Sequence, residues 1–190
     1  DLWCDYIYLD TDERRRFAQV SHEYLIEQLQ YQQMTEQNQR LNFNHPVKEL
    51  VWCNADAAAG SINHASTNEN ASALLPATTW QLKLNGHDRF AERPTTYFTR
   101  QQVYDYHTGH GGVNVDTKDG VGNPVKSIYD SIFVYSFALK PEEHQPSGTC
   151  NFSRIDNAQL HCSNNTAVSS STHWTVYAVN YNVLRIMSGM

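Results

Sequence analysis

The stretch WQLKLNGHDRF, residues 80–90, decides the fold class. In its first five residues, apolar Trp and Leu alternate with Gln and Lys. This alternation predicts a β-strand with one buried face. Asn85-Gly86 follows at once, and both residue types tolerate a positive φ, so the pair favours a two-residue hairpin turn. The chain is therefore expected to turn back on itself at Asn85.

The same two-residue period recurs on both sides of this hairpin. It predicts further strands at residues 25–32, 41–44, 96–106, 128–139 and 174–187. Residues 128–139 are apolar or aromatic on both faces, which is typical of a strand between two layers. Many short strands with a single helix predict an all-β fold, a β-sandwich of the jelly-roll type.

The single predicted helix covers residues 10–23. Asp10 or Thr11 can accept hydrogen bonds from the free amides of its first turn, and the acidic side chains that follow suit the positive end of the helix dipole. Two long loops, residues 55–79 and 105–127, are rich in small and polar residues. Loops of this length in a compact domain are usually functional or mobile.

Composition argues against several classes of partner. The 190 residues carry 14 Lys plus Arg against 20 Asp plus Glu, a formal net charge of −6. The sequence has no basic stripe of the kind that binds phosphates, so we expect no direct contact with nucleic acid. No apolar run approaches the ~20 residues that span a bilayer. The first residue is not Met and residues 2–9 resemble the middle of a strand, so we expect a fragment of a longer product.

The four cysteines are Cys4, Cys53, Cys150 and Cys162. None forms a Cys-x-x-Cys pair, which argues against a zinc ribbon and against a dense disulfide framework. Free thiols in a reducing compartment are the simplest interpretation. A bridge between Cys150 and Cys162 stays open if their strands are neighbours.

His87, His107 and His110 are the candidate metal ligands. Cupin-type jelly rolls bind metal through two histidines one residue apart, so that both side chains converge inside the barrel. The sequence contains no His-x-His, and the spacing of His107 and His110 on a loop fixes no geometry. We therefore expect no metal and no cofactor. A cupin-like or lectin-like jelly roll that binds metal or carbohydrate remains the alternative function.

A hydrolase is also considered, because Ser, His, Cys and Asp are all present. The Gly-x-Ser-x-Gly elbow that holds a nucleophilic serine is absent. Cys150, which follows Ser147-Gly148-Thr149, would need a base beside it, and His144 and His161 are candidates only by closeness in sequence. We expect no catalytic residue and no enzyme.

Two sets of surface residues remain. Asn70, Asn151 and Asn164 each begin an Asn-x-Ser/Thr sequon, which indicates glycosylation only in a secretory context. Arg89 and Arg93 each follow an acidic residue, so we expect them in ion pairs on the surface or between subunits.

Several longer motifs carry more specific information. They are DTDERRRFAQ (10–19), HEYLIEQLQ (22–30), LNFNHP (41–46), LNGHDRF (84–90), YSFALKP (135–141), QPSGTCNFSRIDNA (145–158) and NYNVLRIMSGM (180–190). In this order they resemble the major capsid protein of nucleocytoplasmic large DNA viruses, above all its iridovirus and algal phycodnavirus branch. The resemblance covers the chain except the two long loops.

The resemblance implies a structural protein of the virion, assembled in the host cytoplasm. Subunits of the family are double jelly rolls that form trimeric, pseudo-hexameric capsomers. The capsomers tile an icosahedral shell outside an internal membrane, together with minor capsid proteins. On this plan residues 1–9 are the last strand of a truncated first jelly roll, 10–23 are a connector helix and 24–190 are the second jelly roll. The two long loops would lie on the outward crown.

The stretch KPEEHQPSGTCNFSRIDNA, residues 140–158, resembles a reactive loop because it contains His, Cys, Ser and Asp. Its prolines and glycine break strand pairing and predict a corner between two strands instead. Phe152 and Ile155 are then expected to face the core. Arg154 and Asp156 are the candidate subunit contacts, since charges at the rim of an interface set register and partner choice.

Overall fold

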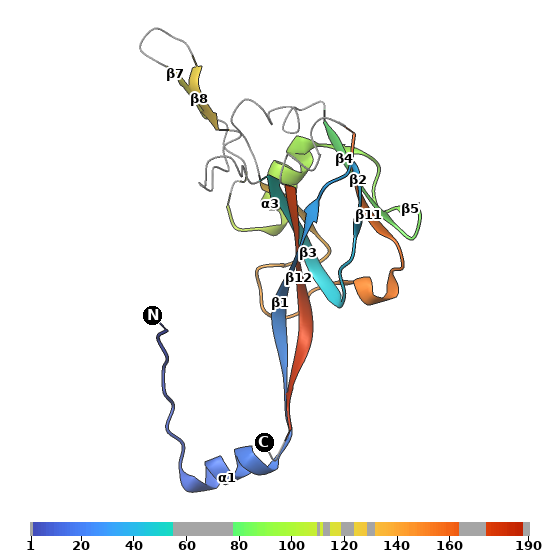
Figure 1. Cartoon of the computed structure of the whole chain (residues 1–190). Coiled ribbons are helices and arrows are strands. Elements are labelled where there is room, and N and C mark those ends of the chain that lie inside the picture. The colour runs from blue at the N-terminus through green and yellow to red at the C-terminus, as the bar shows by residue number, and fades with distance from the viewer. Residues whose placement is uncertain are drawn as a thin grey trace. The chain divides into compact units, whose positions relative to one another are not determined.

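The computed structural model describes residues 2–54, 78–109, 111, 115–118, 124–128, 132–163 and 174–187 (Figure 1). The chain divides into two compact units. The first comprises Asp1–Ile26 and Asn182–Met190, and the second is Glu27–Tyr181.

The first unit contains α1 (Thr11–Gln19), the start of β1 (His22–Met34) and the end of β12 (Trp174–Ile186). Asp10 caps α1, because its Oδ1 accepts a hydrogen bond from the Glu13 amide at 2.8 Å. The helix is shorter than the predicted 10–23. Val20 already has extended backbone (φ −110°, ψ 138°), and the aromatic and β-branched residues after it favour the strand that begins at His22.

Residues 2–9 form neither helix nor strand in the described chain. Their apolar side chains are exposed, Leu2 and Trp3 both to 91%. The expected strand is therefore not formed within this chain, since a strand needs a neighbour to satisfy its amides.

The second unit contains two five-stranded antiparallel sheets (Figure 1). Sheet A has the order β1–β12–β3–β10, with β9 also paired to β3; sheet B has the order β2–β11–β4–β5, with β6 also paired to β4. The further strands of sheet A are β3 (Pro46–Asn54), β9 (Ile132–Ser136) and β10 (Cys150–Asn151). Sheet B consists of β2 (Asn38–Leu41), β4 (Thr79–Leu84), β5 (His87–Asp88), β6 (Arg93–Pro94) and β11 (Ala158–Cys162). The all-β prediction is confirmed.

A separate ribbon pairs β7 (Val115–Lys118) with β8 (Pro124–Ile128). The prediction of an unbroken loop at 105–127 is therefore wrong. Residues 55–77 of the other predicted loop lie outside the described residues, and Thr79 already belongs to β4.

Four aromatic side chains fill the space between the two sheets. Trp52, Phe133 and Trp174 come from sheet A and Trp80 comes from sheet B, and each is at most 1% exposed. The Trp80 ring lies 5.7 Å from that of Trp52, 5.3 Å from Phe133 and 5.2 Å from Trp174. Aromatic pairs at these distances add about 0.5–1.5 kcal/mol each beyond their buried area. The alternating stretch at residues 80–84 therefore anchors sheet B to sheet A.

The predicted hairpin is present. Leu84 pairs with His87, and Asn85 (φ 51°) and Gly86 (φ 79°) both have positive φ between them. This is the backbone that a two-residue hairpin turn requires.

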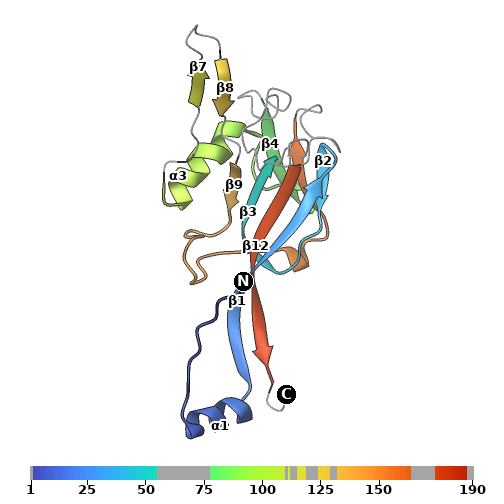
Figure 2. The same ribbon diagram turned by 60° about the vertical axis from the view of Figure 1, so that its left-hand side comes forward.

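The strand predicted at residues 96–106 is wrong, because these residues are helical. They form a π-helical turn, η2 (Tyr97–Gln101), followed by α3 (Gln102–Tyr106). Phe98, Thr99 and Gln102 are buried, and their spacing puts them on one helical face. The helix lies beside β9 (Figure 2). Gln102 Oε1 accepts a hydrogen bond from the Ser136 amide at 3.1 Å, so a side chain stands where a further strand would pair with β9.

Candidate functional site

The chain leaves sheet A after β9 and rejoins it as β10 on the same edge of β3. Ile132–Ser136 pairs with Cys53–Glu49, and Cys150–Asn151 pairs with Val47–Pro46. The residues between, 137–149, are here named the corner loop. They are an insertion in one edge of the sheet, and the predicted corner between two strands is therefore present.

A short 3-10 turn, η3 (Phe152–Arg154), follows the corner loop. Phe152 is 2% exposed and Ile155 packs against the core, so both face inward as predicted. Asn151 Oδ1 accepts a hydrogen bond from the Ser153 amide at 3.1 Å, and Ser153 Oγ accepts one from the His45 amide at 2.8 Å. These bonds fix the turn against the start of β3.

The turn after η3 is joined to the β4–β5 hairpin. Asn85 Oδ1 accepts hydrogen bonds from the amides of Asp156 (3.0 Å) and Asn157 (3.1 Å). The Asn85 amide donates to the Asn157 carbonyl at 2.7 Å. The Asn of the hairpin turn thus also positions the corner.

This junction brings together most of the predicted contact residues. Arg89 follows the hairpin, and Arg154 and Asp156 lie on the corner; all three are exposed. Arg93 lies elsewhere, on β6 opposite Trp80, where its guanidinium stands 5.4 Å from the centre of the Tyr97 ring. Three of the four residues therefore share one end of sheet B, and Arg93 is at the other end of β4.

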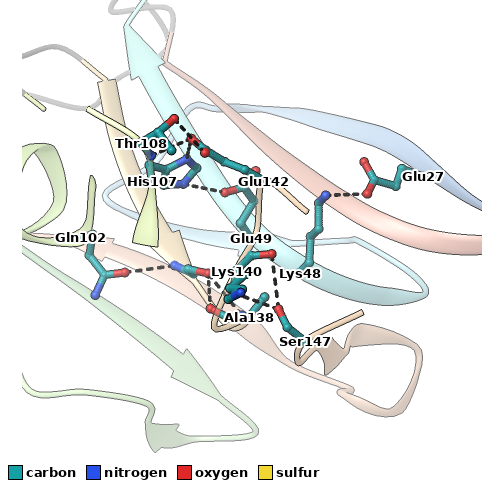
Figure 3. A network of polar contacts seen from close by, with 11 residues as sticks. Glu27, Lys48, Glu49, Gln102, His107, Thr108, Ala138, Lys140, Glu142 and Ser147 are labelled. Atoms are coloured by element: carbon teal, nitrogen blue, oxygen red, sulfur yellow. Dashed lines mark hydrogen bonds and ion pairs between the residues drawn. The ribbon is translucent and has the colours of Figure 1, made fainter. Parts of the chain in front are cut away.

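The corner loop meets α3 in a polar network that the sequence did not predict (Figure 3). The network is defined as Glu49, His107, Thr108 and Glu142. His107 Nε2 lies 3.0 Å from Glu49 Oε2, and His107 Nδ1 lies 3.2 Å from Glu142 Oε1. Thr108 donates to Glu142 twice, from its amide (2.9 Å) and its hydroxyl (2.8 Å). A histidine at the end of α3 thus stands between the corner loop and sheet A.

A second cluster of charges lies at the neighbouring residue of β3. Lys48 is only 3% exposed, and its Nζ lies 2.7 Å from Glu27 Oε1 on β1. The same Nζ stands 5.6 Å from the centre of the Tyr181 ring. His144 of the corner loop approaches Glu27 with its Nδ1 at 3.5 Å. A buried ammonium needs such a partner, because desolvation of an unpaired charge is costly.

Burial and hydrogen bonding act in opposite directions on the two carboxyl groups of the network. Burial raises the pKa of Glu49, although the nearby His107 and Lys48 oppose it. The two hydrogen bonds from Thr108 hold the pKa of Glu142 below its ordinary value. Glu49 therefore holds a proton more tightly than an ordinary glutamate, and Glu142 holds one less tightly.

The network does not have the form of a metal site. The two carboxylates lie on opposite nitrogens of the His107 ring, so the three side chains do not converge on one point. Among the residues that the structure describes, no three His, Cys, Asp or Glu side chains could hold a metal ion. His87 is exposed on β5, and His110 lies outside the described residues.

The four cysteines are free thiols. Cys150 lies on β10 of sheet A and Cys162 is buried on β11 of sheet B, and burial raises the pKa of the Cys53 and Cys150 thiols. A raised pKa disfavours the nucleophilic thiolate. The structure thus contains no bridge between Cys150 and Cys162, and it gives Cys150 no activation.

Other predicted sites are placed only in part. Asn151 is exposed beside η3, whereas Asn70 and Asn164 lie outside the described residues. Ser147 Oγ is occupied by the corner loop itself, since it accepts from the Lys140 amide at 2.9 Å. In the described part of the chain, no helix is long and apolar enough to cross a membrane.

Comparisons with known proteins agree with the motif resemblance. A family model for the large eukaryotic DNA virus major capsid protein matches residues 13–190. The chain is 50% identical to the major capsid protein of Pyramimonas orientalis virus, over 100% of this chain and 47% of that protein. It is 41% identical to the major capsid protein of Paramecium bursaria Chlorella virus 1, over 100% of this chain and 52% of that protein.

Solved structures give the same result. A quasi-atomic model of the PBCV-1 virus capsid superposes with a TM-score of 0.69 at 37% identity, over 97% of this chain and 54% of that chain. The Faustovirus major capsid protein reaches a TM-score of 0.56 at 12% identity over 96% of this chain and 36% of that chain, a likeness of fold alone. The jelly-roll prediction is thereby confirmed. The chain spans about half the length of the two curated relatives named above.

The match over residues 13–190, the two relatives above 40% identity and the two-sheet fold agree with one another. The chain belongs to the major capsid protein family of large eukaryotic DNA viruses, a family of structural capsid proteins rather than enzymes.

Proposed function

We propose that this chain is the C-terminal half of a double jelly-roll capsid subunit, and that three such subunits form a pseudo-hexameric capsomer of an icosahedral shell. Residues 1–9 would be the last strand of the first jelly roll, residues 10–23 the connector and residues 24–190 the second jelly roll. The protein would act by assembly, without catalysis, cofactor or metal. Its further partners would be minor capsid proteins, and it would be assembled in the host cytoplasm.

The observation that carries the proposal is a set of large apolar side chains that the described residues leave exposed. In the first unit, Tyr6, Ile7 and Tyr8 of the extended N-terminal segment are at least 80% exposed. In the second unit, Leu29 and Tyr31 on one face of β1 are 61% and 72% exposed. Exposed apolar side chains that gather on one segment indicate a protein–protein contact. It supports a subunit whose remaining half and neighbours cover these side chains.

Exposed charges around the junction of the hairpin and the corner suit the rim of such a contact. We assign Arg89, Arg154 and Asp156 to contacts between subunits, with Arg93 as a separate contact at the other end of β4. Charges at a rim set orientation and partner choice more than affinity. Glycans on Asn70, Asn151 or Asn164 would lie on the outer surface of the shell.

A matched pair of variants on β1 tests the proposal in the expressed full-length protein. Tyr31→Asp places a charge on the apolar face, and Gln33→Asp places the same charge two residues further along the same face. Tyr31→Asp should reduce the yield of assembled capsomers, while Gln33→Asp should leave it near wild type. Negative-stain images of the wild type should have a hexagonal outline. Equal assembly by both variants, with no such outline in the wild type, would contradict the proposal.

A further inference from the structure

The base of the corner loop is fastened to β3 by backbone hydrogen bonds. The amides of Phe137 and Ala138 donate to the Lys48 carbonyl at 2.9 and 3.2 Å. Across the loop, the Lys140 amide donates to Ser147 Oγ at 2.9 Å. These bonds join backbone and hydroxyl groups, so they do not change with pH.

The tip of the corner loop, between Lys140 and Ser147, is held by side chains rather than by backbone hydrogen bonds. On its α3 side these side chains are those of the polar network. Glu142 is the loop's residue in the network, and its partners Thr108 and His107 follow α3. On its other side, the His107 ring contacts Glu49 of β3. The side chains of His107 and Glu49 are 18% and 11% exposed, whereas that of Glu142 is 40% exposed. On its α3 side the tip is therefore attached to the sheet through the imidazole ring of His107, and on its β1 side His144 approaches Glu27 at 3.5 Å.

The number of protons decides whether both contacts of this ring are favourable. A neutral imidazole has one N–H donor and one acceptor nitrogen, and an ionised carboxylate can only accept. With Glu49 and Glu142 both ionised and His107 neutral, one ring nitrogen would present a lone pair to a carboxylate oxygen about 3 Å away. One added proton makes both contacts attractive. The contact between His107 Nδ1 and Glu142 becomes a charge-assisted hydrogen bond. Glu49 Oε2 and His107 Nε2 are 3.0 Å apart without hydrogen-bond alignment, so that contact gains from charge alone.

The surrounding charges do not replace that proton. On β3, Lys48 is the other cation that acts on Glu49, but its ammonium is already paired with Glu27 of β1. On the corner loop, Lys140 pairs with Glu143 at 3.0 Å. His144, 67% exposed, lies at the longer distance of 3.5 Å from Glu27. Tyr181 of β12 contributes a neutral ring over Lys48, since burial raises the pKa of its hydroxyl.

We propose that the corner loop is fastened to α3 and β3 in a pH-dependent way. One proton held between His107 and Glu49 keeps the tip of the loop against α3 and β3. Loss of that proton releases the tip from them, while the base stays bound. The residues at both ends of the fastening, 107–108 and 142, would open together. The base separates the tip from β10 and η3, so the surface beside Arg154 and Asp156 would keep its shape.

The directions of the two pKa shifts define a pH range in which the tip is attached. The pKa of Glu49 is raised by burial, so its stabilising effect is present at low pH and is lost as the pH rises through its folded value. The pKa of Glu142 is lowered by Thr108, so its effect is present at higher pH and is lost as the pH falls through its folded value. The tip should be closed between these two limits.

Hydrogen exchange of the full-length protein in its native assembly tests the proposal. Exchange of peptides covering residues 107–108 and 137–149 is followed from about pH 5 to about pH 8, where histidine changes charge, and is corrected for intrinsic exchange. The peptide of β4 serves as the internal reference. In the wild type, protection of the corner loop should fall as the pH rises towards the upper limit, because Glu49 then loses its proton.

Three variants separate the proposal from a general loss of structure. His107→Gln removes the ring that lies between the two carboxyl groups and should weaken the pH dependence of the protection. Glu49→Gln supplies an amide donor to a neutral His107, so the loop should stay protected at the upper limit. His144→Gln, the control, should keep the wild-type pH dependence. If His107→Gln keeps that dependence, if Glu49→Gln loses protection at the same pH as the wild type, or if His144→Gln alone abolishes the dependence, the proposal is wrong.

Discussion

The aromatic core and the polar network both attach sequence-distant segments to β3, but they do so by different physics. Trp52 faces sheet B and is surrounded by rings from β4, β9 and the π-helical turn η2. Glu49 is an odd number of residues away, so it projects from the opposite face, towards His107. Burial of apolar surface is non-directional and independent of pH. The strength of the polar network depends on distances and on the number of bound protons. Strand β3 therefore carries a permanent attachment, the aromatic core, and a conditional attachment, the network, which depends on pH.

The largest expected effect concerns the permanent attachment. Trp80→Ala should lower the free energy of unfolding by about 3–5 kcal/mol, because it removes the ring on which three others pack. Trp80→Phe is the matched control and should cost much less. Trp80 Nε1 has no hydrogen-bond partner within the described structure, so Phe loses volume but no hydrogen bond. Chemical denaturation measures both; equal costs would mean that the ring packing is not the main source of stability.

An intermediate effect tests how tightly the base of the corner loop is built. Gly148 has φ +145°, and a Cβ there would lie 2.9 Å from the Phe137 carbonyl oxygen. Gly86 also has positive φ, but a Cβ there would meet nothing within 4 Å.

Gly86→Ala should therefore cost about 1–2 kcal/mol from backbone strain alone, and Gly148→Ala should cost more because Phe137 must also move. The midpoint of urea unfolding gives both values. A smaller loss for Gly148→Ala than for Gly86→Ala would show that the base of the loop is not closely packed.

The smallest effect belongs to the conditional attachment. Glu142→Gln removes a carboxylate whose pKa Thr108 holds below the ordinary value of 4.5. Because a lowered pKa stabilises the folded state above the ordinary value, the variant should be less stable than the wild type near neutral pH. The difference should vanish as the pH falls through the folded pKa of Glu142. Unfolding curves at several pH values measure it, and a difference that grows on acidification would contradict this assignment.

Local patterns predicted the permanent parts of the fold well. The alternation at residues 80–84 and the Asn-Gly pair determine a strand and a turn within a few residues, because burial and positive φ are local requirements. The strand prediction at residues 96–106 failed because it relied on aromatic content, which favours strands. The buried positions Phe98, Thr99 and Gln102 follow a helical spacing instead.

The polar network could not be predicted in the same way. Glu49, His107 and Glu142 are 35 or more residues apart and meet only after the sheets have formed. One signal was present: Lys48-Glu49 interrupts the apolar run VKELVW of residues 47–52. Two charges inside a buried strand require partners, so this pair indicated a polar contact without identifying it. Arg89, Arg154 and Asp156 lie close together because Asn85 of the hairpin turn accepts hydrogen bonds from the amides of Asp156 and Asn157.

The native mass of the full-length protein, measured by light scattering after size exclusion, tests the central claim most directly. A capsid subunit of the proposed kind should elute as a stable complex with three times the mass of the polypeptide. A protein that remains a monomer over the accessible concentration range would contradict the capsomer assignment.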